Sequence, residues 1–351
     1  MDSPLAVLLT ILGILNPSMG QTNNNNNDIN ITTAAISDRL SLYFYKSTCP
    51  RVEQIIEDVI RNQSQKNPGI IPGIMRLHFH DCYITGCDAS ILLTPQRYNS
   101  YNAEMSHPAN GKSLRGMDAL EAAKAELEKQ CPGVVSCADI LAYAARDVVM
   151  LSGSPKYEVP AGRRDSFCSD GTLAGALPKA NDTLATLQKG FAARGLTLED
   201  MVVLEGSHSI GQTRCLNTIA DTGSMTRLLD VESLVDKPFQ SMIKQKFCPE
   251  SQKRVFWNLT APLTPEKPDN SAWGNSFYQL ILKGKSLLPS DIALAVDPST
   301  KEMVERFAYD NANWQNVFNE AMIKLGKVNV LTGDQGEIRR QCGWINAVNT
   351  A

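Results

Sequence analysis

The sequence predicts a mainly α-helical fold with very little β-structure, and three observations support this. Apolar residues recur at helical spacing over residues 52–60 and again over residues 117–127, so each stretch has one apolar face. Residues 137–151 are mostly apolar and are followed by Ser-Gly-Ser-Pro, as expected for a buried helix that stops there. Long runs that alternate between apolar and polar residues are absent. We expect one domain of two helical halves, the second starting near Pro178.

The N-terminal segment has a different character. Residues 5–15 form an apolar run that small residues follow, which predicts a signal peptide over residues 1–20, although the run is preceded by Asp2 and by no lysine or arginine. An uncleaved anchor is the alternative, but the run is shorter than the roughly 20 residues that span a bilayer. An Asn-rich tract then predicts a disordered segment over residues 21–40. The folded domain is expected over residues 41–351.

Two segments have the residue pattern of a capping box, in which a Ser or Thr is followed three residues later by an acid. The first is Thr197-Leu-Glu-Asp and the second is Ser299-Thr-Lys-Glu. We expect a helix to begin after Thr197 and another after Ser299.

Charge and composition exclude some partners. The chain has 351 residues and a formal net charge of −3, with no dense run of lysine or arginine. Nucleic acids and anionic membranes are therefore poor candidate partners. A hydrophobic content of 43% supports a large core. These values favour a globular protein that acts on a small molecule.

Cysteine usage and glycosylation sequons fit a secreted protein. The chain has nine cysteines, so eight can pair and one is left over. Four Asn-X-Ser/Thr sequons would become glycosylated only in the secretory pathway. They begin at Asn30, Asn62, Asn181 and Asn258.

Residues 76–87, Arg-Leu-His-Phe-His-Asp-Cys-Tyr-Ile-Thr-Gly-Cys, are the most informative stretch. If this stretch is helical, Arg76 and His80 lie four residues apart on one face. A cation beside a group that exchanges protons near neutral pH suits a reaction that moves one proton and stabilises one developing anion. Cys82 and Cys87 enclose a short loop rich in oxygen donors, which indicates a metal site behind the pair.

From Leu42 to Asn346 the chain resembles the secretory plant haem peroxidases of class III. The resemblance rests on several motifs that occur in the family's order. They are residues 44–50 (Phe-Tyr-Lys-Ser-Thr-Cys-Pro), 76–82, 86–93 (Gly-Cys-Asp-Ala-Ser-Ile-Leu-Leu), 136–139 (Ser-Cys-Ala-Asp), 159–166 (Val-Pro-Ala-Gly-Arg-Arg-Asp-Ser), 206–211 (Gly-Ser-His-Ser-Ile-Gly), 290–291 (Ser-Asp) and 341–342 (Gln-Cys).

This resemblance implies an all-α haem-peroxidase fold whose two lobes enclose haem b. It implies an enzyme that reduces H2O2 to water and oxidises small phenolic or aromatic donors by one electron at a time. The expected protein is a secreted monomer of the cell wall or apoplast, or alternatively of the vacuole. No membrane or nucleic-acid partner is expected.

The resemblance assigns a role to each residue on the two sides of the haem. His80 would transfer a proton between the oxygens of H2O2, and Arg76 would stabilise the charge that develops. Phe79 would cover the haem face. Asn110 would accept a hydrogen bond from the imidazole of His80.

On the other side, His208 resembles the proximal ligand of haem iron, and Asp291 resembles the aspartate that accepts the N–H of this ligand. An alternative for Asp291 is a helix N-cap after Ser290.

The resemblance also implies calcium. The first site would use side-chain oxygens of Asp81, Asp88 and Ser90 with main-chain carbonyls of Ile84 and Gly86. Glu104 resembles a residue that holds a water near this site.

A second calcium site, beside Ser209, departs from the family pattern because Trp273-Gly274-Asn275 stands where the family has Phe-Asp-Asn. The departure removes a carboxylate ligand, so we expect this site to be weak or empty.

Other structural features follow from the resemblance. Cys168 is expected to be a buried or shielded free thiol, and Asp139 and Arg163 a buried ion pair. Pro178 is expected to contact donors at the haem edge. The implied disulfides are Cys49–Cys131, Cys82–Cys87, Cys137–Cys342 and Cys215–Cys248.

Two rival interpretations remain. The first is a secreted zinc protein that uses His78, His80, Cys82 and Cys87, although histidines two residues apart face different sides of a helix and these thiols would form a disulfide in an oxidising compartment. The second is a haem-binding protein that has lost catalysis, which the altered second calcium region permits. The presence of the five expected active-site residues argues against it.

Overall fold

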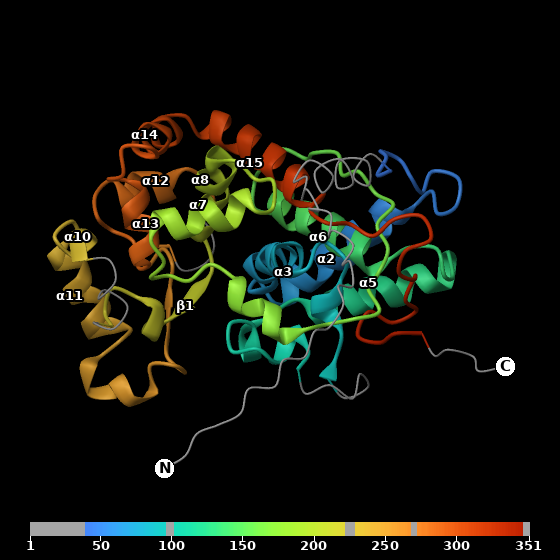
Figure 1. The fold of residues 1–351 in the computed structure, drawn as a ribbon, viewed down its shortest axis with the longest axis horizontal. Helices are drawn as coiled ribbons and strands as arrows, with labels where there is room; N and C mark the ends of the chain where they lie inside the picture. The colour runs from blue at the N-terminus through green and yellow to red at the C-terminus, as the bar shows by residue number, and fades with distance from the viewer. Residues whose placement is uncertain (1–38, 96–101, 222–228, 268–271, 347–351) are drawn as a thin grey trace, which may run out of the picture.

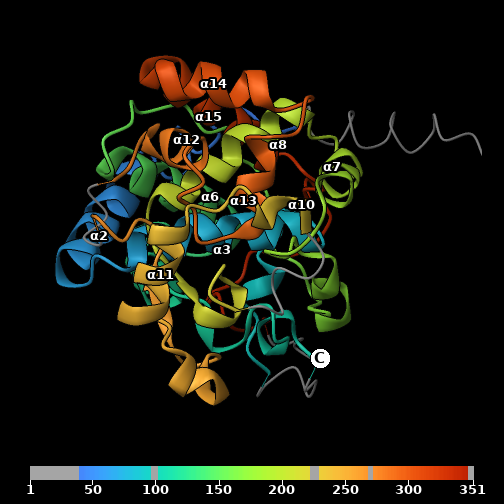
Figure 2. The same ribbon diagram turned by 90° about the vertical axis from the view of Figure 1, so that its left-hand side faces the viewer.

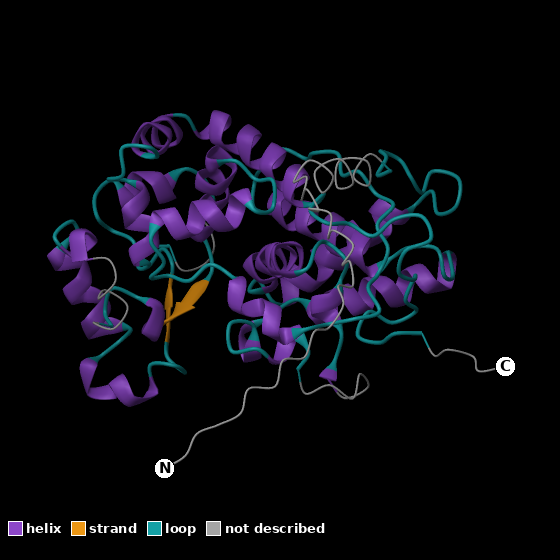
Figure 3. Ribbon diagram, viewed as in Figure 1, coloured by secondary structure: helices purple, strands orange, loops and turns teal. Residues whose placement is uncertain are grey.

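The computed structural model describes residues 39–95, 102–221, 229–267 and 272–346. The predicted signal peptide and nearly all of the predicted Asn-rich disordered segment lie outside these ranges. Within them the protein is mainly helical, as predicted (Figure 3).

The first half of the chain is built around one buried helix. This helix, α6 (Cys137–Leu151), packs against α2, α3 and α5. It is buried along nearly its whole length, which explains its apolar sequence. Figure 1 shows α3 near the middle of the molecule, with the other three helices to one side. Their bounds are α2 (Val52–Lys66), α3 (Ile70–Ile84) and α5 (Met117–Gln130), with short 3-10 helices η1 (Ser90–Leu92), η2 (Glu104–Ser106), η3 (Gly111–Ser113) and η4 (Gly171–Ala176).

The second half forms a separate group of helices that covers α3 (Figures 1 and 2). In this group α8 packs against α7 and α15, and α14 packs against α12. One hydrophobic core runs through both halves. The bounds are α7 (Leu184–Ala192), α8 (Leu198–Glu205), η5 (Gly206–Ser209), α12 (Ser276–Ile281), α13 (Pro289–Leu294), α14 (Lys301–Tyr309) and α15 (Asn311–Leu325).

A smaller unit projects from the second half and has its own core (Figure 1). The unit begins with strand β1 (Gln212–Arg214) and ends with strand β2 (Thr260–Pro262). These antiparallel strands form the only sheet of the described residues. The other elements of this unit are η6 (Cys215–Asn217), α10 (Leu229–Glu232), α11 (Lys237–Lys246) and η7 (Glu250–Val255).

All four expected disulfides are present. Cys137–Cys342 joins α6 to the C-terminal segment, and Cys215–Cys248 closes the smaller unit. Cys168, expected to be buried or shielded, is instead exposed. It lies in the connection between the two halves, where the chain runs over the surface.

The predicted ion pair between Asp139 and Arg163 is buried, with 2.8 Å between Oδ1 and Nη1. The hydroxyl of Tyr45 donates to Oδ2 of Asp139 at 2.7 Å. This network ties the start of α6 to the N-terminal segment and to the segment that follows α6. Its role is structural.

The two predicted helix caps differ. Thr197 and Asp200 form the complete capping box at the start of α8. A helix also begins at the second segment, but α14 starts one residue later, after Thr300, and the predicted side-chain cap is absent. The Ser299 hydroxyl donates to Asp297 at 2.6 Å instead. The Ser299 side chain therefore stabilises the local turn at Asp297 and does not cap α14.

None of the helices in the described ranges has both the length and the apolar character needed to cross a bilayer.

The caps give a paired test. Thr197→Ala should lower the free energy of unfolding by about 1 kcal/mol, because it removes the acceptor for the Asp200 N–H at the start of α8. Ser299→Ala is the matched control and should change stability by less than about 0.5 kcal/mol. Denaturant unfolding measures both, and equal losses would show that the cap assignment is wrong.

Candidate active site

The helix α3 carries Arg76 and His80 on one face, as their spacing predicts. The guanidinium of Arg76 donates to main-chain carbonyls of Ala109 and Ser113 at 3.0 and 3.3 Å, and to the Ser113 hydroxyl at 3.1 Å. Burial lowers the pKa of Arg76 to about 10, and Arg214 and Arg115 add to the shift. Arg76 therefore stays cationic near neutral pH in a fixed position.

His80 is oriented by Asn110. Its Nδ1 lies 2.6 Å from Oδ1 of Asn110, which is fully buried. The amide nitrogen of Asn110 donates to the Glu104 carbonyl at 2.9 Å, so the amide oxygen is the atom that faces His80. Because an amide oxygen can only accept, Nδ1 of His80 carries the hydrogen and Nε2 keeps its lone pair.

The pKa of His80 agrees with this role. Burial lowers it to about 3, and the Arg76 cation contributes, while the hydrogen bond with Asn110 opposes the shift. The imidazole is therefore neutral near physiological pH. It can accept a proton at Nε2.

The predicted calcium site spans the last turn of α3 and the loop that follows, and its two carboxylates are buried. Asp81 accepts hydrogen bonds from the main chain of Ala89 and Ile91 at 3.0 and 3.4 Å. Asp88 accepts one from Ser90 N at 3.0 Å. Gly86 has φ of 145°, and a Cβ there would lie 2.4 Å from the Asn329 carbonyl oxygen, so the loop requires glycine.

Glu104 is the feature that points to a cation. It is 0% exposed, and neither carboxylate oxygen has a hydrogen-bond partner. Burial raises the pKa of Glu104 to about 8, and Asp88 adds to the shift. Burial also raises the pKa of Asp81 well above its usual value, and Asp88 and Glu104 reinforce this. Buried carboxylates that raise one another's pKa are suited to a divalent cation.

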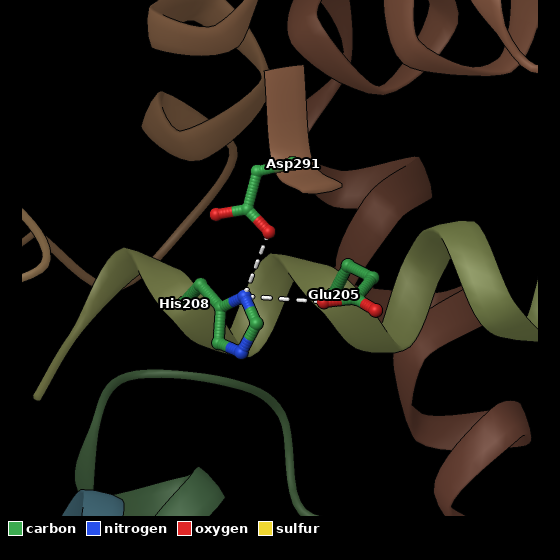
Figure 4. A group of neighbouring side chains, drawn as sticks. All are labelled: Glu205, His208 and Asp291. Carbon is green, nitrogen blue, oxygen red and sulfur yellow. Dashed lines mark hydrogen bonds and ion pairs between the residues drawn. The ribbon is translucent and has the colours of Figure 1, made fainter. Parts of the chain in front are cut away.

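His208 lies on η5, and its Nδ1 contacts two carboxylates (Figure 4). Oδ1 of Asp291 accepts from Nδ1 at 3.1 Å, and Oε2 of Glu205 lies 3.1 Å from the same nitrogen. The second oxygen of Asp291 accepts from the Ser286 hydroxyl at 2.8 Å. Figure 4 shows Nε2 pointing away from both carboxylates, and 32% of the side chain remains accessible. Nε2 is therefore left for a ligand.

These surroundings give His208 a pKa opposite in direction to that of His80. Burial alone would lower the pKa of His208, but Asp291 and Glu205 outweigh it and raise it to about 9. Asp291 is the third residue of α13 and not its N-cap, so the alternative role considered for it is not found.

The elements that carry the two histidines approach each other. A Cβ on Gly211, three residues after His208, would lie 3.1 Å from Pro72 of α3. The Arg76 cation is also close enough to lower the pKa of His208. Both imidazoles thus belong to one region between the two halves of the chain.

Ser209 is fully buried. Its carbonyl oxygen accepts from the Thr264 hydroxyl at 2.7 Å, and its own hydroxyl has no partner. Trp273 Nε1 donates to Ser154, and Asn275 donates to carbonyls of α14. A weak or empty second calcium site stays a prediction.

Phe79 packs with aromatic rings behind the site, at 5.1 Å from Tyr83 and 5.9 Å from Phe191 between ring centroids. Pro178 lines a surface hollow of about 270 Å³ together with Tyr83, Lys189 and Arg194. This hollow is accessible to a small molecule.

The zinc interpretation does not fit the structure. Cys82 and Cys87 are joined in a disulfide, so neither offers a thiolate. His78 is buried away from His80 and lines a separate small cavity with Arg163 and Met322.

Glu205 is the site residue that the sequence reasoning missed. Its signal was present, because it lies three residues before His208, a spacing that brings side chains together in a 3-10 helix. Together with His208 and Asp291 it forms the one group of three acidic or histidine ligand atoms within 4.8 Å of one another in the described residues.

Comparison with known proteins shows the family of the chain. A family model described as peroxidase matches residues 56–310. Peroxidase 1 of Zea mays is 37% identical over 313 residues, which cover 88% of this chain and 83% of that protein. Peroxidase 5 of Vitis vinifera is 37% identical over 310 residues, covering 88% and 92%. Peroxidase 71 of Arabidopsis thaliana is 36% identical over 306 residues, covering 86% and 88%.

Proposed function

Because the chain belongs to the class III plant peroxidases, a family of haem and calcium enzymes, we propose that it reduces H2O2 with electrons from small phenolic donors at a haem b bound by His208. The observation that carries this proposal is the state of the two imidazoles. Each has Nδ1 engaged by a protein acceptor and Nε2 left available.

His208 would bind iron through Nε2, with Asp291 as the acceptor that fixes the ring. When bound, haem supplies the iron centre that cleaves the O–O bond of peroxide and then accepts electrons from the donors. Phe79 would cover the face of the porphyrin on the side of α3.

His80 is proposed as the acid–base residue. Its Nε2 lone pair takes a proton from one oxygen of H2O2 and returns it to the other, which leaves as water. The hydrogen bond to Asn110 supports this role, because it holds the tautomer in which Nε2 is free. Arg76 is proposed to stabilise the negative charge that grows on the departing oxygen. Its fixed attachment to Ala109 and Ser113 supports this role.

Calcium would bind at the end of α3 and the loop that follows, through oxygens of Asp81, Ile84, Gly86, Asp88 and Ser90. The ion would neutralise the buried carboxylates, including Glu104 at its edge. Because Asp81 follows His80 directly, the ion would also hold the end of the catalytic helix in place.

Phenolic donors are proposed to approach past Pro178, beside the hollow that it lines. We further propose a secreted monomer, in the cell wall or the vacuole, with a signal peptide at residues 1–20 and a folded domain over residues 41–351. Four disulfides are suited to an oxidising compartment. Asn62 and Asn258 are exposed and can receive glycans.

The central experiment measures the reaction of the purified haem-loaded protein with H2O2 by rapid mixing. His80→Ala should slow this reaction by roughly 10²–10⁴-fold while the Soret band shows haem still bound, because the proton acceptor is gone.

His78→Leu is the matched control, since it removes a neutral histidine from the same helix but from a different side, and it should react at nearly the wild-type rate. A full-rate reaction in His80→Ala would disprove the assignment. A wild-type protein that binds haem but does not react with H2O2 would favour the interpretation of lost catalysis.

Arg76→Leu should slow the same reaction by about 10²-fold, because one charge-stabilising donor is lost while the base remains. The effect should be smaller than that of His80→Ala in parallel measurements. A larger effect would mean that Arg76, and not His80, dominates the cleavage step.

Calcium removal should destabilise the protein. At free calcium 100 times its Kd, binding contributes about 2.7 kcal/mol of stability, so a chelator should lower Tm and calcium should restore it. The variant Asp81→Asn/Asp88→Asn is the control and should not respond to the chelator. A wild-type Tm that does not respond to the chelator would contradict the site.

A further inference from the structure

We infer that Glu205 is a second anionic partner of the proximal histidine, a positioning residue that acts with Asp291 to strengthen the electron donation of His208 to haem iron. This inference rests on the proposed function, because it takes His208 as the iron ligand.

Geometry brings Glu205 to His208. Glu205 is the last residue of α8, and the chain continues directly into η5, so the two side chains share one face. Oε2 of Glu205 lies as close to Nδ1 of His208 as Oδ1 of Asp291 does, at 3.1 Å. Nδ1 of His208 therefore has one hydrogen-bond acceptor, Asp291, and a second carboxylate, Glu205, in ion-pair contact (Figure 4).

The turn between these residues is fixed by packing. A Cβ on Gly206 would lie 2.6 Å from Trp314 Nε1 and 2.7 Å from the Tyr278 hydroxyl. These two groups donate to the carbonyls of Val202 and Val203 near the end of α8. The position of Glu205 relative to His208 is thus set by the core and not by a mobile loop.

The location is electrostatically unfavourable for a carboxylate. Glu205 stands at the C-terminus of α8, where the helix dipole disfavours negative charge. Only 12% of its side chain is accessible, and its ion-pair partner among the described residues is His208, with no lysine or arginine. A carboxylate held there gains its favourable interaction from its ion-pair contact with the His208 ring.

The chemical consequence concerns the iron. A negative charge at Nδ1–H draws the proton toward the carboxylate and makes Nε2 a stronger donor, which favours ferric over ferrous iron. Two carboxylates should do this more than one. The contribution of Glu205 should therefore appear in the reduction potential of the resting enzyme, independently of turnover.

The test is spectroelectrochemistry of the haem-loaded protein. Glu205→Gln keeps the size and an acceptor oxygen but removes the charge, and should raise the ferric/ferrous potential by about 59 mV, a tenfold change in relative stability. The iron–histidine stretching frequency of the ferrous protein should fall. Glu199→Gln is the matched control: it removes a carboxylate from the same helix, where it pairs with exposed Arg306, and should leave both values unchanged.

Asp291→Asn shows how far the potential shifts when the established hydrogen-bond partner of His208 loses its charge. Glu205→Ala replaces Glu205→Gln if the Gln variant folds poorly. A potential in both Glu205 variants equal to that of Glu199→Gln would overturn the inference and leave the proposed function intact. The proposed function has its own check, because His208→Ala should change the haem spectrum. An unchanged spectrum in that variant would overturn both.

Discussion

The Nδ1 atoms of His80 and His208 are each bound by an acceptor from elsewhere in the chain, and the chemistry of the site depends on what those acceptors are. Asn110 offers a neutral oxygen, so burial and Arg76 keep the His80 imidazole uncharged and able to take a proton. Asp291 and Glu205 offer charged oxygens, so the pKa of His208 rises. In the proposed function, one residue type would thereby serve as a base on one side and as a strong metal ligand on the other.

The acceptors in turn depend on the packing of distant segments. Asn110 is oriented by its bond to the Glu104 carbonyl, and the buried Glu104 carboxylate interacts electrostatically with Asp81 and Asp88 at the end of α3. A cation bound there would stabilise both the end of the helix that carries His80 and the segment that orients its partner. The predicted calcium site and the His80–Asn110 pair are therefore connected through α3 and Glu104. Loss of the ion would also disturb the position of His80.

Spacing within one helix allowed much of this to be predicted from sequence. Arg76 and His80 had to share a face, because helix geometry fixes the positions of residues four apart. The disulfides and the partner of His80 followed from resemblance, since nothing local places Asn110 opposite His80. Predictions failed where two local interactions competed, as when Ser299 bonded Asp297 instead of capping α14. The exposure of Cys168 depends on the path of a long connection, which no periodic pattern specifies.

Glu205 shows why part of a site escapes sequence reading even when its spacing is visible. In an α-helical continuation, residues three apart are neighbours but not eclipsed, and a glutamate at a helix end would ordinarily face solvent. Here the chain tightens into η5 because Gly206 must fit against Trp314 and Tyr278, residues more than 70 positions away in the sequence. The second carboxylate at His208 is therefore a product of tertiary packing. Its energetic effect should not simply add to that of Asp291, because both carboxylates lie at the same ring nitrogen.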